Sequence, residues 1–135
     1  MNHHRFSPTA VLLPLAAVLL VPQAARAGEV IANASVTLSA DEVREVFVGD
    51  KQLAGGTKLV PVDNGAAQAD FTAKVLQMDV AKYTSLWTKK AFREGLTAPA
   101  VKGSDAEVIA YVKATPGAVG YVAGASAGVK VLQKF

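Results

Sequence analysis

An apolar run near the start of the chain decides how much of it can fold into a domain. Residues 10–21 are apolar throughout, two histidines and an arginine precede them, and an Ala-Arg-Ala sequence ends at position 27. This order is typical of a secretory signal peptide with a small-residue cleavage site. The run contains Pro14 and is shorter than the about 20 residues that a membrane span needs. We therefore expect residues 1–27 to be a cleaved signal peptide.

The remaining residues, 28–135, are enough for one exported, soluble domain with one modest core. Of the 14 lysines and arginines, Arg5 and Arg26 lie in the leader. The domain therefore has 12 basic and 11 acidic residues, a nearly balanced charge that does not indicate nucleic-acid binding. Both histidines, His3 and His4, also lie in the leader, and the chain has no cysteine. Disulfides and chemistry based on histidine or cysteine are therefore not expected in the domain.

Strand and helix signals alternate along the domain. The predicted strands are residues 29–34, 57–62, 118–123 and 128–135. The predicted helices are residues 40–48, 66–77, 80–92 and 105–115, and residues 93–103 are predicted to be a loop. Within the second strand, Pro61 favours an edge or a terminal position. This alternation predicts an α/β fold with a small mixed sheet flanked by helices.

Polar residues mark three of the helix starts. Ser39 with Glu42, and Ser104 with Glu107, match the capping-box pattern, in which each side chain of the pair bonds to the other residue's backbone N–H. Asp79 is a predicted N-cap of the helix that follows it. Tyr83, Leu86 and Trp87 share one face of that helix, and we expect them to lie in the core.

The turn after the second strand is the candidate ligand site. The first N–H groups of a helix have no partner within the helix, so a strand that turns through glycine into a helix can hold an anion. The predicted ligand-binding residues are Asn64, Gly65, Ala66, Ala67 and Gln68. In the alternative interpretation the turn is only a corner, in which Asp63 caps the helix and uses the same amides.

Motifs for catalysis and for metal binding have simpler interpretations. Residues 124–128 match the G-x-S-x-G elbow, but a strand signal follows them and Ser126 lacks a histidine base, so we expect a hairpin-like turn and no enzyme. Asp41, Glu42 and Glu45 are read as a solvated helix face, and no metal or cofactor is expected. Lys89, Lys90 and Arg93 are read as offsetting the partial charge at a helix C-terminus, with a docking patch as the alternative.

The order of several segments resembles a known family. "VIANASVTLSADEVREVFVGDK", "SLWTKKAF" and "GSDAEVIAYVKATPGAVGYV" follow one another as in the phosphate-type periplasmic substrate-binding proteins of ABC transporters, and residues 38–49 and 112–122 are the most similar parts. The resemblance implies a type II periplasmic-binding-protein fold, of which this chain is long enough for one of the two lobes. In those relatives the candidate turn carries an arginine and a Ser-Gly-Thr, neither of which is present here.

Two functions follow from these observations. The first is an exported solute-binding-like protein that binds phosphate or another small oxyanion in ABC-type uptake or sensing, with a homo-oligomer, a membrane transporter or a membrane sensor as partner. The second is a non-catalytic protein–protein interaction module that keeps the fold and has lost the ligand.

Overall fold

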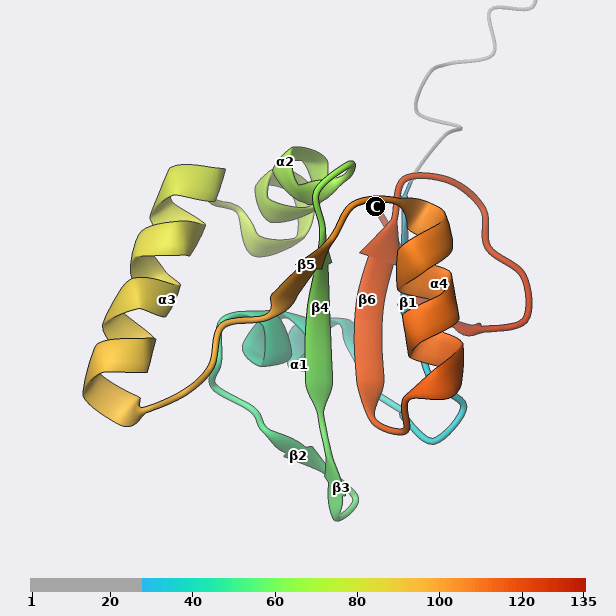
Figure 1. The fold of residues 1–135 in the computed structure, drawn as a ribbon, viewed down its shortest axis with the longest axis horizontal. Helices are drawn as coiled ribbons and strands as arrows, with labels where there is room; N and C mark the ends of the chain where they lie inside the picture. Colours follow the sequence, from blue (N-terminus) through green and yellow to red (C-terminus); the bar gives the residue numbers. More distant parts are fainter. Residues whose placement is uncertain (1–27) are drawn as a thin grey trace, which may run out of the picture.

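The computed structural model describes residues 28–135, so the predicted signal peptide lies outside the described residues (Figure 1). The strands are β1 (Glu29–Ala32), β2 (Leu53–Ala54), β3 (Thr57–Lys58), β4 (Val60–Asn64), β5 (Ala100–Lys102), β6 (Ala118–Val122) and β7 (Lys130–Lys134). The helices are α1 (Ala40–Phe47), α2 (Gln68–Phe71), the π-helix η2 (Thr72–Leu76), α3 (Val80–Glu94) and α4 (Asp105–Ala114).

Five strands form one mixed sheet in the order β5-β4-β6-β1-β7. β4 is parallel to both β5 and β6, whereas β1 is antiparallel to both β6 and β7. The predicted mixed sheet flanked by helices is therefore confirmed. Because β4, β5 and β6 are parallel, their carboxyl ends meet at one edge, which is also where the turn after β4 and the start of α4 lie (Figure 1).

The two faces of the sheet are covered by different helices. α4 packs on one face, where the buried residues are Ile31, Val62, Val108, Val112, Ala118 and Val122. A larger cluster covers the other face and draws its side chains from α1, α2, η2 and α3. An aromatic group lies in this cluster, in which Phe71 stacks on Tyr121 with 3.9 Å between ring centroids and Phe47 meets both rings edge-on.

The first capping box is confirmed and the second is half correct. Ser39 Oγ accepts from Glu42 N, and the Glu42 carboxylate accepts from Ser39 N. Ser104 Oγ accepts from Glu107 N at 3.3 Å, but the Glu107 carboxylate accepts from Gly103 N. Ser39 and Ser104 are therefore both N-caps, and each sequence pattern correctly marks the start of a helix.

The segment around Pro61 differs from the single strand that the sequence predicts. Residues 57–58 form β3 of a separate two-stranded sheet, and β4 begins at Val60. β4 is an interior strand, so the edge alternative for Pro61 is wrong and the terminal alternative is correct. Pairing with β5 starts at Val62, one residue later, so the missing N–H of Pro61 interrupts no bond with β5.

Three further expectations need correction. The helix predicted at 66–77 is shorter and is split into α2 and η2, and Gln77 ends it with a left-handed φ of 56°. The loop predicted at 93–103 contains β5, a strand of three residues that is too short to give an alternation signal. β6 and β7 form no hairpin, because β1 lies between them and residues 123–129 cross over it.

Candidate functional site

The predicted anion turn lies at the carboxyl end of β4, and the amides of residues 65–67 already have acceptors. Gly65 N donates to Lys102 O at 2.8 Å, Ala66 N to Asn64 Oδ1 at 3.0 Å, and Ala67 N to Asn64 O at 3.0 Å. The second of these bonds is an Asx turn, the local motif in which an asparagine side chain accepts from the amide two residues on. An external anion at this turn would have to replace at least one of these acceptors.

Asn64 connects the turn to the start of α4. Its side chain is fully buried, and its Nδ2 donates to Asp105 Oδ1 at 2.7 Å and to the backbone oxygen of Tyr121 at 3.0 Å. Asp105 also accepts from two amides after β6, Ala123 N to Oδ1 at 3.0 Å and Gly124 N to Oδ2 at 3.2 Å. One carboxylate therefore collects three donors at the carboxyl edge of the parallel strands.

Asp63 is not the helix cap that the corner interpretation requires. The N-cap position of α2 is Ala67, which makes no side-chain cap bond, and Asp63 is only 2% exposed. The Asp63 carboxylate instead accepts from Tyr83 Oη at 3.1 and 3.0 Å and from Tyr121 Oη at 2.9 Å. Asp63 therefore does not cap α2, and the side chain that bonds to an amide of the turn is Asn64.

Burial sets the acid–base properties of this cluster. Loss of solvation raises the pKa of Asp63 to about 6, and the hydrogen bonds from Tyr121 and Tyr83 oppose this rise without cancelling it. Burial and the neighbouring Asp63 charge raise the pKa of both tyrosines, which therefore stay protonated as donors. The cluster is thus a buried carboxylate whose hydrogen bonds come from the hydroxyl groups of Tyr83 and Tyr121 instead of from water.

This raised pKa predicts a specific pH dependence of stability. The folded protein holds the Asp63 proton more tightly than the unfolded chain, whose pKa is near 3.8, so stability from this group is fully present below about pH 4 and is lost as the pH rises through 6. A shift of about two units corresponds to at most about 3 kcal/mol. The free energy of unfolding can be measured in urea for the wild type and for Asp63→Asn between pH 4 and pH 7. Relative to the variant, the wild type should lose about 2–3 kcal/mol of stability over this range. A difference that stays constant with pH would contradict the assignment.

A small hollow lies beside the turn at the same edge of the sheet. It has a volume of about 240 Å³ and is lined by Gly28, Gly65, Ala66, Ala67, Ala69, Asp70, Ala123 and Phe135. Three of the five predicted ligand residues therefore line one hollow. Asn64 is fully buried and does not line the hollow, while Gln68 lines a different pocket.

That second pocket is a groove between α3 and the edge strand β5. It has a volume of about 690 Å³, and Asp63 and Tyr83 are among its lining residues together with Gln68. Phe92 and Val101 also line it and are 90% and 60% exposed. The groove is therefore mainly apolar, with the buried carboxylate cluster on one wall.

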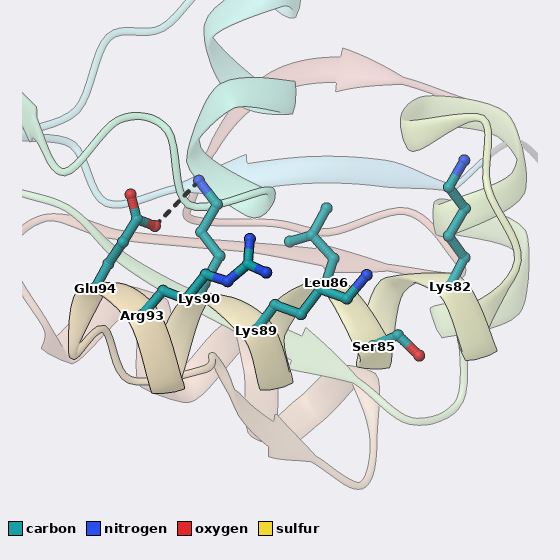
Figure 2. Close-up of a pocket in the computed structure, with 7 residues that line it drawn as sticks. All are labelled: Lys82, Ser85, Leu86, Lys89, Lys90, Arg93 and Glu94. Carbon is teal, nitrogen blue, oxygen red and sulfur yellow. Dashed lines mark ion pairs between the residues drawn. The ribbon is translucent and has the colours of Figure 1, made fainter.

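The outer face of α3 carries the basic residues that the sequence singles out (Figure 2). Lys89, Lys90 and Arg93 lie around a shallow depression of about 500 Å³, together with Lys82, which the sequence analysis did not single out. Lys90 is paired with Asp50 and Glu94, while the ion pairs of residues 28–135 include none to the other three. The docking-patch alternative stays a prediction.

The G-x-S-x-G segment does not have the geometry of a nucleophile elbow. Ser126 Oγ donates to Glu29 Oε2 at 3.0 Å, and the G-x-S-x-G segment leads into strand β7, whereas a nucleophile elbow leads into a helix. Within residues 28–135 no three His, Cys, Asp or Glu side chains gather in a way that could hold a metal ion. None of the helices in this part of the chain is long and apolar enough to cross a membrane.

The chain is similar to a solved structure described as the crystal structure of an ABC-type phosphate transport receptor from Vibrio cholerae. The TM-score is 0.50 and the sequence identity 16%, over 79% of this chain and 45% of the receptor. The fold is that of a periplasmic-binding-protein-like lobe. The chain thus spans less than half of the receptor's length, and at this identity the similarity establishes the fold alone. No family model and no curated protein matches the sequence.

The sequence points to the turn but not to its partners. In the sequence, Asp105 lies within a capping pattern, Tyr83 is predicted to lie in the core, and Tyr121 lies within a predicted strand. The sequence does contain one signal for a buried polar partner. Asp63 is an ionisable residue at the end of the apolar strand "VPVDN", and such a residue needs a polar partner when it is buried. The identity of that partner depends on the tertiary fold.

Proposed function

We propose that residues 28–135 form an exported, non-enzymatic lobe of the solute-binding type that binds a small oxyanion such as phosphate in ABC-type uptake or sensing. The observation that carries the proposal is the hollow at the carboxyl ends of the parallel strands, lined by Gly65, Ala66 and Ala67. Open α/β sheets hold ligands at this edge. The similarity in fold to a phosphate transport receptor supports the choice of an oxyanion.

A lone lobe should bind such an anion weakly. The hollow is lined by the acidic residue Asp70 and by no lysine or arginine. In addition, the amides of residues 65–67 already have acceptors within the protein. A second copy of the chain, or a membrane transporter or sensor, would supply the missing cationic contacts. We therefore expect a dissociation constant on the order of 1 mM for the isolated lobe, which corresponds to about 4 kcal/mol.

Amide chemical shifts during a phosphate titration test this proposal. With ionic strength held constant by chloride, the amide signals of residues 64–68 should move saturably with phosphate. Gly65→Pro, which removes one N–H of the turn, should abolish the movement. Gly65→Ala is the matched control, because it keeps that N–H and its added carbon meets neighbours at 3.5 Å or more, an ordinary contact.

Shifts that sulfate and chloride reproduce in equal measure, or no saturable shift in a folded wild type, would refute oxyanion binding by the turn. Solution mass measured with and without phosphate shows whether ligand binding and self-association are linked. A dimer that forms only in the presence of phosphate would indicate that a second copy of the chain supplies the missing cationic contacts.

A second candidate is the protein–protein interaction module that has lost the ligand. The observation that favours it is that the amides of residues 65–67 already have acceptors, while Phe92 and Val101 are exposed beside the groove. An edge strand next to an apolar groove can accept an extended peptide as an additional strand. Absence of any anion binding would leave this candidate in place of the first.

A further inference from the structure

Three hydrogen-bond donors from two separate segments converge on Asp105. The side-chain amide of Asn64 and the backbone N–H of Ala123 reach Oδ1 at 2.7 and 3.0 Å, and the backbone N–H of Gly124 reaches Oδ2 at 3.2 Å. We call these three donors the cradle. Bonds to a charged acceptor are stronger than neutral ones, and both carboxylate oxygens are engaged here.

One donor of the cradle, the side-chain amide of Asn64, is held in place by bonds that do not involve Asp105. Asn64 is 0% exposed, its Oδ1 accepts from Ala66 N, and its Nδ2 also donates to Tyr121 O. These two bonds orient the amide group so that its N–H faces Asp105. The fold thus fixes a donor toward an anion position, independently of what fills that position.

The cradle lies where an α/β sheet of this kind binds ligands. Asn64 is the last residue of β4, and Ala123 and Gly124 follow β6, so the donors belong to the carboxyl edge of two paired parallel strands. Asp105 is the first residue of α4, where the helix's partial positive charge adds to the attraction for an anion. Ala123 also lines the hollow beside Gly65 and Ala66.

We propose that the Asp105 carboxylate is a built-in anion that fills an oxyanion cradle, and that removing it creates a site for small carboxylates and phosphate. The inference rests on the proposed function, since it names what competes with an external oxyanion at this edge. It explains physically why the wild-type lobe should bind anions weakly. Asp105 is partly exposed, so an external anion can reach the position that its carboxylate vacates.

Formate is the probe, because it carries one carboxylate and little else. Asp105→Ala should be destabilised, and formate should raise its melting temperature saturably, with binding at least roughly ten-fold tighter than to the wild type, which corresponds to about 1.4 kcal/mol. Phosphate should bind the same variant more tightly than it binds the wild type. Chloride at equal ionic strength should do neither.

Two further variants make the test specific. Asp41→Ala removes an acidic residue from the first turn of α1, where there is no cradle, and should show no formate effect. Asp105→Asn fills the space and should likewise take up no formate. Equal formate effects in Asp41→Ala and Asp105→Ala, or none in a folded Asp105→Ala, would overturn the inference.

If Asp105→Ala does not fold in chloride, refolding in formate decides the question. Recovery of native circular dichroism in formate alone would support the cradle, and no recovery in either salt would overturn it. The proposed function is tested separately, by phosphate on the wild type. If the wild type does not bind phosphate but Asp105→Ala binds formate, oxyanion binding by the native lobe is refuted and the inference about the cradle is supported.

Discussion

Replacing Phe71 with alanine should lower the free energy of unfolding by about 3–5 kcal/mol, the usual cost of truncating a buried phenylalanine. Phe71 is 0% exposed and stacks on Tyr121 with 3.9 Å between ring centroids, and the rings of Phe47 and Phe135 meet its edge. Its removal would leave a cavity among rings that are fixed on several elements and cannot collapse easily. Urea unfolding followed by circular dichroism measures the loss.

Phe92→Ala is the matched control for this variant. It makes the same change on α3, at a side chain that is 90% exposed, and should alter stability by less than about 0.5 kcal/mol. A loss at Phe92 comparable to that at Phe71 would mean that the groove between α3 and β5 is filled in solution. It would also contradict the placement of the core in the aromatic cluster.

Gly117→Ala should destabilise the protein by about 3–5 kcal/mol, because two costs add there. Gly117 has a left-handed φ of 83°, and a Cβ on it would lie 2.0 Å from the backbone oxygen of Lys58. That atom cannot move away like a flexible side chain, since the neighbouring Val60 N is bonded to Gly117 O. Thermal and urea unfolding should both report the loss.

Gly56→Ala separates these two costs. Gly56 has nearly the same φ, 81°, but nothing lies within 4 Å of its would-be Cβ. Only the backbone strain of about 1–2 kcal/mol should remain. Equal losses in the two variants would show that the close approach of Lys58 to Gly117 is not maintained in solution.

Local features of the sequence predicted helix starts and the fold class. Ser39 and Asp79 start their helices, as capping chemistry requires. The alternation of strands and helices gave the correct fold class. These features succeed because the groups that satisfy them lie within a few residues in the chain.

Features that depend on distant residues were not predictable in the same way. Asp63 finds its phenol donors 20 and 58 residues away, and Asn64 finds Asp105 41 residues away. The Asn-Gly pair did signal a turn, and Asn64 forms its Asx bond. No local pattern could show that the same side chain also faces a carboxylate on another element.

The position of β1 between β6 and β7 has a consequence for the order of folding. Glu29 pairs with Val122 on one side and with Lys134 on the other, so the first described strand has both neighbours near the far end of the chain. Contacts that close such long loops form slowly, because chain entropy must be lost before the pairing compensates for it. Until β6 and β7 are available, both edges of β1 stay unpaired. A chain that is synthesised from its amino terminus would therefore complete this sheet only when its last strands have been made.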